Sequence, residues 1–323
     1  MSDKAARVPG SEDPKDRAWR RHRGDYRLDA AGPPERLAPG LYIVATPIGN
    51  LGDITLRALA ALSGADLIAC EDTRVTRKLL DRYGIAKPLA AYHDHNAEEV
   101  RPKLLRRLAE GAAIALVSDA GTPLISDPGF KLVRAAREAG CPVTALPGPS
   151  ALLAALSIAG LPTDQFYFAG FLPAKETARR ARIAELAGIP ATLVLFETGP
   201  RIAAALADLA AGLGNREAAL CRELTKLHEE VRRGDLPSLA ESCAARERRG
   251  EIVLVIAPPQ TPPRPSAADT DALLRHALGR VSLKDAVAEV AAQTGVSRRE
   301  LYRRALALAK EKEMQDVGRD TAR

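Results

Sequence analysis

Residues 41–158 alternate between short apolar runs and stretches whose apolar residues recur at helical spacing. The short runs are typical of buried strands, and the three- or four-residue repeats are typical of one face of a helix. The expected strands are Leu41–Ala45, Asp66–Cys70, Pro88–Ala91, Ile114–Val117 and Val143–Leu146, and the expected helices are Thr55–Leu62, Thr73–Tyr83, Ala97–Ala109, Gly129–Ala139 and Pro149–Ile158. Consecutive strand–helix units of this kind predict an α/β fold with a mainly parallel sheet.

Turn-forming residues at 159–164 interrupt the alternation, which indicates that a second α/β subdomain follows. Its expected elements are strand Phe166–Gly170, helix Glu176–Ala187, strand Ala191–Phe196, helix Pro200–Ala211, strands Ala218–Arg222 and Glu229–Arg233, helix Leu236–Arg248 and strand Ile252–Ile256. Two of these strands follow each other without a helix, which predicts a mixed sheet. We therefore expect an N-terminal α/β subdomain over residues 39–159 and a C-terminal one over residues 160–258.

The two ends of the chain have a different pattern. Residues 1–38 combine scattered charges, Pro and Gly without an apolar period, so we expect a disordered basic arm, either a solvated extension or a segment that touches RNA. Residues 258–265 are rich in proline, which predicts a linker over residues 259–269. Amphipathic segments at Thr270–Leu278, Leu283–Gln293 and Arg298–Lys310 then predict a small helical module over 270–310, followed by a tail over 311–323.

The last two segments of this module have the pattern of a helix-turn-helix, with Ser297 as the N-cap of the second helix. Arg298 and Arg299 would lie on that helix, as in an element that contacts nucleic-acid phosphates. Between residues 275 and 310, eight Lys or Arg stand against three Asp or Glu, and the whole chain has a net charge of +6. The module is therefore a candidate RNA-facing surface, although a bundle that packs on the core would show the same pattern.

Composition narrows the class of protein. With 46% hydrophobic residues among 323, the chain can bury a large core. Its four cysteines are widely spaced, without CxxC or a Cys/His cluster, so they indicate neither a zinc site nor a disulfide framework. We find neither the apolar core of a signal peptide nor an apolar run of membrane length, so we expect a cytoplasmic protein that has no membrane partner.

The most informative stretch is Val117–Gly129, which lies between an expected strand and an expected helix. Its two Gly, two Pro and five small polar side chains exceed what one strand-to-helix turn needs, so we interpret it as a ligand loop. Ser126 or Asp127 could instead simply cap the next helix, with Pro128 at its first position. The loops that follow the strands of a parallel sheet share one edge, which is the usual ligand site.

Further unusual loops follow the other strands. Thr46–Asp53 contains neither GxGxxG nor GxxxxGK[ST], which argues against NAD and ATP. Glu71–Arg74 offers two carboxylates and an arginine, either as a helix cap with an ion pair or as substrate ligands. His93–Asn96 could chelate through alternate residues, but no further ligand has a recognisable spacing, so we expect hydrogen bonding to RNA or substrate and no metal. Leu146–Ala151 leads into a helix whose amino terminus could bind a polar group.

Eight sequence motifs together resemble those of one family. In chain order they are ATPIGNLGDITLRA, EDTR, YHDHN, VSDAGTPLISDPG, LPGPSA, FAGFLP, LFETGPR and RELTKLHEE. Their residues, order and spacing resemble those of the ribosomal RNA small subunit methyltransferase I family over residues 41–258. The resemblance implies two α/β subdomains of tetrapyrrole-methylase type, with S-adenosyl-L-methionine in the cleft between them, and a homodimer. It also implies methylation of the ribose 2′-hydroxyl of a cytidine in the decoding region of 16S ribosomal RNA.

The resemblance also implies roles for single residues. The positions expected to contact the cofactor are Pro47, Ser118, Asp119, Ile125, Ser150, Ala151, Glu197 and Leu224. A carboxylate, lysine or histidine could accept the hydroxyl proton. The candidates are Asp72, His93, Glu197, Glu223 and Lys226. Groups suited to RNA contacts are Arg74, His93, Lys175, Arg201, Arg298 and Arg299. Glu197 replaces an apolar residue that is common in tetrapyrrole-acting relatives, which leaves its own role open.

Two other functions compete with this one. A tetrapyrrole methyltransferase would use the same fold and cofactor, but the basic helical module and the motifs EDTR and RELTKLHEE speak against it. A non-enzymatic RNA-binding protein would need the basic ends but not the loops. The expected partners are small-subunit ribosomal RNA or the 30S subunit and a second copy of the chain. Because aromatic residues make up only 4% of the chain, we expect RNA recognition by charge and shape rather than by base stacking.

Overall fold

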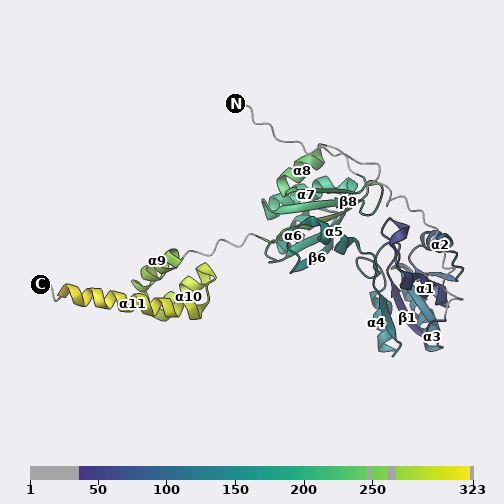
Figure 1. Cartoon of the computed structure of the whole chain (residues 1–323), viewed down its shortest axis with the longest axis horizontal. Coiled ribbons are helices and arrows are strands. Elements are labelled where there is room, and N and C mark those ends of the chain that lie inside the picture. Colours follow the sequence, from purple (N-terminus) through teal and green to yellow (C-terminus); the bar gives the residue numbers. More distant parts are fainter. Residues whose placement is uncertain (1–35, 246–248, 260–266, 321–323) are drawn as a thin grey trace. The chain divides into compact units, whose positions relative to one another are not determined.

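The computed structural model describes residues 36–245, 249–259 and 267–320, with side chains up to residue 309. The chain divides into two compact units, the first ending at Pro258 and the second beginning at Pro259. Figure 1 shows their helices and strands and labels those for which there is room. Almost all of the predicted arm, the end of the predicted helix Leu236–Arg248, most of the linker and the last residues of the tail lie outside the described residues.

The first sheet has five parallel strands in the order β3-β2-β4-β1-β5. They are β1 (Gly40–Val44), β2 (Leu67–Cys70), β3 (Leu89–Ala91), β4 (Ala113–Val117) and β5 (Val143–Leu146). This arrangement confirms the predicted parallel sheet. All five carboxyl ends therefore point to one edge, from which the unusual loops start.

Helices cover both faces of this sheet. They are α1 (Leu56–Gly64), α2 (Thr73–Arg82), α3 (Ala97–Ala109) and α4 (Phe130–Glu138). One apolar cluster joins α1 and α2 to side chains such as Ile68 and Val117, and another joins α3 and α4 to side chains such as Leu41 and Ile114. A short 3₁₀ helix, η3 (Leu51–Asp53), lies in the loop after β1 and was not predicted. Apolar packing on both faces explains why the strands form unbroken apolar runs in the sequence.

The second sheet has the order β6-β7-β10-β8-β9. Its strands are β6 (Phe166–Phe171), β7 (Thr192–Thr198), β8 (Glu217–Arg222), β9 (Glu230–Asp235) and β10 (Glu251–Ile256). The pair β6–β7 is parallel and the other pairs are antiparallel, which confirms the predicted mixed sheet. The helices α6 (Glu176–Ala187), α7 (Gly199–Leu213) and α8 (Leu236–Ala244) pack on one face of it.

The opposite face of the second sheet is covered by α5 (Ala151–Ala159), the helix that follows β5 of the first sheet. Its Leu156 packs with Val194 and Val253 of the second sheet, and Ile48 from the loop after β1 joins the same cluster. Two loops that leave the first sheet thus end in the core of the second. The subdomain boundary predicted after residue 159 stays a prediction, because α5 lies before that boundary in the sequence but packs on the second sheet.

The second unit consists of α9 (Ala267–Leu278), α10 (Leu283–Thr294) and α11 (Arg298–Asp320). Apolar side chains from all three, including Leu274, Val290 and Leu301, form a separate small core. The hydroxyl of Ser297 accepts the Glu300 N–H, which confirms the predicted cap. The last helix continues beyond the predicted end at Lys310. Among the described residues, no helix combines the length and apolarity required to cross a bilayer.

Candidate functional site

The loops after β1, β4 and β5 form one bonded structure. Thr46 and Gly121 exchange two backbone hydrogen bonds, of 2.9 and 3.0 Å. The Thr46 hydroxyl also donates to the Ser118 carbonyl (3.2 Å), and the Thr122 hydroxyl donates to the Pro149 carbonyl (3.2 Å). The loop Val117–Gly129, called the central loop from here on, is therefore held by both of its neighbours at the edge of the first sheet.

A fourth loop, between β8 and β9, joins this structure from the second sheet. A Cβ built on Gly49 would lie 2.3 Å from Cγ of Lys226, so the lysine stem crosses directly over the loop after β1. The Lys226 ammonium forms ion pairs with Glu223 (3.0 Å) and Glu251 (2.7 Å). The close approach requires a glycine at position 49, and the two ion pairs keep the lysine stem in place.

A cavity of about 310 Å³ lies where these loops meet. It is lined by Ile48, Asp53, Thr55, Gly148, Pro149, Ser150, Ala154 and Thr225. Its walls combine apolar side chains, three hydroxyl groups and one carboxylate, a composition that suits a small ligand with both apolar and polar parts.

Backbone strain is concentrated in the central loop and in the β8–β9 loop. Among the described residues, the non-glycine residues with positive φ are Leu124 (75°), Ser126 (64°), Glu223 (50°) and Thr225 (65°). Such conformations are costly for residues with a Cβ and persist only where the surroundings enforce them. The strained residues therefore lie in the same two loops that contact the loop after β1, through the hydrogen bonds of Thr46 and through Lys226.

Neither Ser126 nor Asp127 caps the helix that follows the central loop. The N-cap of α4 is Gly129, the last residue of that loop, at φ 130°, and no side chain forms a cap hydrogen bond there. The alternative in which Ser126 or Asp127 caps α4 is therefore wrong, because the helix starts two residues later than a cap at Asp127 requires. This leaves the Asp127 carboxylate available for another role.

Several carboxylates gather beside the central loop. Asp119 accepts the backbone N–H of Asp72 at 3.0 Å. Burial, followed by the Glu71 carboxylate, raises the pKa of Asp127 to about 6. Burial, followed by the Asp119 carboxylate, likewise raises the pKa of Glu71. The sequence named Glu71 as a substrate ligand or part of a cap and Asp127 as a possible helix cap, but it named neither as a proton acceptor, since their proximity depends on how the ends of β2 and β4 meet.

Asp72 and Arg74 pair with each other. The Asp72 carboxylate accepts the Arg74 N–H at 2.8 Å as the cap of α2, and it also binds the Arg74 guanidinium at 2.6 Å. The hydrogen bond from the Arg74 side chain is the main reason why the pKa of Asp72 falls to about 2. This geometry matches the cap and ion pair that the sequence allowed as an alternative to a substrate role.

Glu223 and Lys226 are both held in their charged forms. Burial opposes ionisation of Glu223, but hydrogen bonds from the Glu251 N–H and from Lys226 together leave its pKa below the usual value. Burial also opposes the charge on Lys226, but Glu251 and Glu223 outweigh it and raise the pKa of the lysine. A lysine that stays protonated cannot accept a proton, so these contacts favour a structural role for the pair.

Glu197 lies inside β7, because that strand continues to Thr198 instead of ending at Phe196. It pairs with Ile252 on the face that packs against α6 and α7, opposite to the face covered by α5. One carboxylate oxygen accepts the Thr198 N–H (2.9 Å) and pairs with Arg201 (3.1 Å), while the other is buried and has no hydrogen-bond partner. Burial raises the pKa of this carboxyl. Its contacts anchor Arg201 and give no support to a place beside the cofactor.

The other expected site residues are spread over the molecule. Ser150 lines the cavity, and Pro47, Ala151 and Leu224 are each next in sequence to a lining residue. Ser118 is buried and Asp119 lies beside it in the central loop, whereas Ile125 is 38% exposed. The sequence did not single out Asp53 and Thr55 as site residues, although they lie in or next to the motif-rich loop after β1.

The residues expected to contact RNA fall into two groups. Arg74, Lys175, Arg298 and Arg299 are exposed. His93 is half-buried, with its Nδ1 lacking a partner, and Arg201 donates to the Leu172 carbonyl in addition to its pairing with Glu197. Among the described residues, no three His, Cys, Asp or Glu side chains are arranged to hold a metal ion.

Comparison with family models gives two matches. Residues 40–240 match the tetrapyrrole (corrin/porphyrin) methylases, and residues 264–309 match a model described as the RsmI C-terminal HTH domain. The first match covers the first sheet and all strands of the second except β10, and the second covers α9, α10 and the first part of α11.

The chain is similar to proteins named ribosomal RNA small subunit methyltransferase I. One from Mesorhizobium japonicum is 51% identical over 278 residues, which is 85% of this chain and 94% of the relative. One from Erythrobacter litoralis is 53% identical over 276 residues, which is 85% and 97% of the two chains. Among solved structures, a cobalt precorrin-4 methyltransferase has the same fold, at a TM-score of 0.52 and 17% identity, over 67% of this chain and 94% of that one.

Proposed function

Because the chain belongs to the ribosomal RNA small subunit methyltransferase I family of the tetrapyrrole methylases, we propose that it methylates small-subunit ribosomal RNA with S-adenosyl-L-methionine as methyl donor. The acceptor in this proposal is the ribose 2′-hydroxyl of a cytidine in the decoding region. The observation that carries the proposal is the cavity at which motif loops from both sheets meet.

The residues at this cavity suit S-adenosyl-L-methionine. Ile48 and Ala154 offer apolar surface for the adenosine, while the hydroxyls of Thr55 and Ser150 and the carboxylate of Asp53 can bind ribose hydroxyls or the ammonium group. No phosphate has to be held, which agrees with the lack of a phosphate-binding glycine loop. When bound, the donor supplies an electrophilic methyl group on a sulfonium.

The protein must hold the 2′-hydroxyl in line with that methyl group and accept its proton. Asp72, Glu223 and Lys226 are engaged in ion pairs that stabilise their charged forms. Asp127 has a pKa much nearer to neutrality, and it lies in the central loop itself. We assign it the role of proton acceptor, with Glu71 beside it as a second carboxylate that raises its basicity.

Exposed arginines of the helical unit supply the contacts to RNA phosphates in this proposal. Arg298 and Arg299 lie in the first turn of α11, within the part of the chain that matches the helix-turn-helix model. On the first unit, Lys175 and Arg74 are exposed and can add further contacts. The partners in the proposal are ribosomal RNA or the 30S subunit and a second copy of the chain, and the location is the cytoplasm.

A tetrapyrrole methyltransferase is the second candidate, since the matching fold family and a solved relative act on such substrates by name. The C-terminal helix-turn-helix match and relatives that are about half identical along most of the chain favour RNA instead. A non-enzymatic RNA-binding protein would have no use for the cavity.

The deciding experiment incubates the protein with S-adenosyl-L-methionine labelled in its methyl group and with small ribosomal subunits or naked ribosomal RNA. Nucleoside analysis should find the label on the ribose of a cytidine. Label on a base would contradict the proposed acceptor, and label on a tetrapyrrole alone would establish the second candidate. Failure to bind the cofactor in calorimetry would exclude both enzymes.

A further inference from the structure

Three of the five phenylalanines of the chain meet on one face of the second sheet. The rings of Phe168 and Phe196 lie edge to face with centroids 4.9 Å apart, and Phe171 meets Phe196 in the same way at 5.7 Å. Phe168 and Phe196 are half-buried against the cluster that contains α5, while Phe171 is 50% exposed. A chain poor in aromatic residues thus concentrates them at one place, with one ring open to solvent.

A β-bulge turns Phe171 to this face. Phe168 pairs with Val194 and Phe171 pairs with Phe196, so three steps along β6 match two along β7, and Ala169 is the extra residue. Gly170 takes φ +66° at the bulge. If all four residues from Phe168 to Phe171 alternated regularly, without the bulge, the ring would lie on the face of α6 and α7, because successive side chains point to opposite sides.

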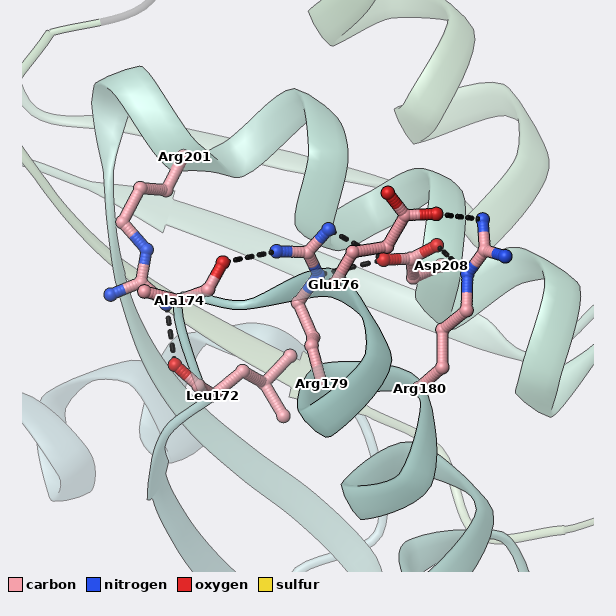
Figure 2. A network of polar contacts seen from close by, with 7 residues as sticks. All are labelled: Leu172, Ala174, Glu176, Arg179, Arg180, Arg201 and Asp208. Carbon is pink, nitrogen blue, oxygen red and sulfur yellow. Dashed lines mark hydrogen bonds and ion pairs between the residues drawn. The ribbon is translucent and has the colours of Figure 1, made fainter.

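The chain that follows Phe171 is fixed by a network of hydrogen bonds and ion pairs, drawn in Figure 2. Arg201 donates to the Leu172 carbonyl, and Arg179 donates to the Ala174 carbonyl at 3.1 Å. Arg179 is itself paired with the buried Asp208 at 2.6 Å. The two arginines therefore hold the backbone after Phe171, and the pairing of β6 with β7 holds the backbone before it, so the aromatic side chain loses little freedom when it binds.

The residue before Phe171 contacts the central loop. A Cβ on Gly170 would be 3.4 Å from the Ser126 hydroxyl, and Ser126 is one of the strained residues of that loop. The Phe171 ring is attached one residue from this contact, on the sheet face against which Ile48 from the loop after β1 also packs. A flat, half-exposed, preorganised ring in this position offers a stacking surface for a planar group at the site of methyl transfer.

We propose that Phe171 is the stacking surface for the base of the RNA nucleotide that receives the methyl group. The inference rests on the proposed function. It departs from the expectation that low aromatic content leaves recognition to charge and shape, since one well-placed ring suffices for one base. The exposed Lys175, four residues further on, supplies a cation for the neighbouring phosphate.

The test measures kcat, and the KM for RNA, of the full chain and of the variants Phe171→Ala and Phe171→Trp. Alanine removes a stacking interaction, so the KM for RNA should rise about 5- to 100-fold, while calorimetric affinity for S-adenosyl-L-methionine stays unchanged. Tryptophan should preserve the KM, and its fluorescence should be quenched when RNA is added, because stacking on a base quenches an indole.

Phe166→Ala is the matched control. Phe166 is 44% exposed on the same strand but lies at its opposite end, before the bulge, so its loss should not change the KM for RNA. A Phe171→Ala variant with the KM of the full chain would overturn the inference. So would a change of its molecular mass in solution, which would identify the ring as a contact between copies. Transfer of no methyl group to RNA by the unchanged chain would instead refute the proposed function.

Discussion

Replacing Asp208 by Asn should destabilise the first unit strongly, because it leaves the Arg179 guanidinium buried without a counter-charge. The two side chains are only 6% and 11% exposed, and their N–O distance is 2.6 Å. Asparagine has almost the same shape as aspartate, so the change removes charge without opening a cavity.

The magnitude follows from the cost of an uncompensated buried charge. Removing one partner of a buried ion pair costs about 3–5 kcal/mol. Arg179 keeps its hydrogen bond to the Ala174 carbonyl, and the new amide oxygen can still accept one N–H, which lowers the expected loss to about 2–3 kcal/mol. Equilibrium unfolding in urea, followed by circular dichroism through the transition of the first unit, measures it.

Two further variants identify the cause. Glu176→Gln removes an ion pair with Arg180 in which both side chains are more than half exposed, so its midpoint should match that of the unchanged chain. Joint replacement of Arg179 by Met and Asp208 by Leu removes both buried charges and should recover most of the lost stability. The argument fails if Asp208→Asn has the same unfolding midpoint as Glu176→Gln, or if the double variant is no more stable than Asp208→Asn.

Three other outcomes are expected. Gly49→Ala brings a Cβ against the Lys226 stem at a positive φ, so calorimetry should show about tenfold weaker cofactor binding, and unchanged affinity would contradict the contact. Asp127 loses its charge as the pH falls through about 6, so turnover should fall there, while Asp127→Asn should be slow at every pH. Because folding raises the pKa of Asp127, the charged carboxylate opposes folding, and the stability that the protonated form contributes is lost as the pH rises through 6. Above pH 6, the Asp127→Asn variant should therefore unfold no more easily than the unchanged chain. Joint replacement of Arg298 and Arg299 by Ala should reduce the salt dependence of RNA binding by about 1.4 logarithmic units per decade of salt, and an unchanged slope would place RNA elsewhere.

The parallel sheet was predictable because its strands are buried on both sides. Ile68 and Val117 contact one layer of helices while Leu67 and Leu116 contact the other, so each strand must be apolar throughout. A run of this kind between two helical repeats has few other interpretations. The mixed character of the second sheet was predictable for a different reason, namely that β8 and β9 follow each other without a helix between them.

Contacts between distant segments were not predictable from local pattern. The approach of Lys226 to Gly49 joins loops from two sheets, and neither residue carries a local mark of it. The face of Glu197 depends on where β7 ends, and two more strand residues turned an expected loop carboxylate into a buried anchor for Arg201. The position of Asp127 beside Glu71 likewise depends on the order of strands in the sheet.

The motifs drew attention to the loops that form the cavity without distinguishing which of their residues line it. Ser150 lines the cavity and was named from its motif, but Asp53 and Thr55 line it as well, although the sequence marked them only as part of a motif. The loop Val117–Gly129 was singled out by its glycines and prolines, which set backbone shape. Which carboxylate it brings next to another becomes visible only in three dimensions.

The bulge in β6, and not the presence of Phe171 alone, decides which face of the second sheet carries the ring. Three steps separate Phe168 from Phe171, but only two separate their partners Val194 and Phe196. Because side chains alternate along a regular strand, the same sequence without the bulge would bring Phe171 opposite Glu197 and turn the ring toward α6 and α7. Gly170, whose φ of +66° belongs to the bulge, therefore helps to determine where the ring one residue further on is placed.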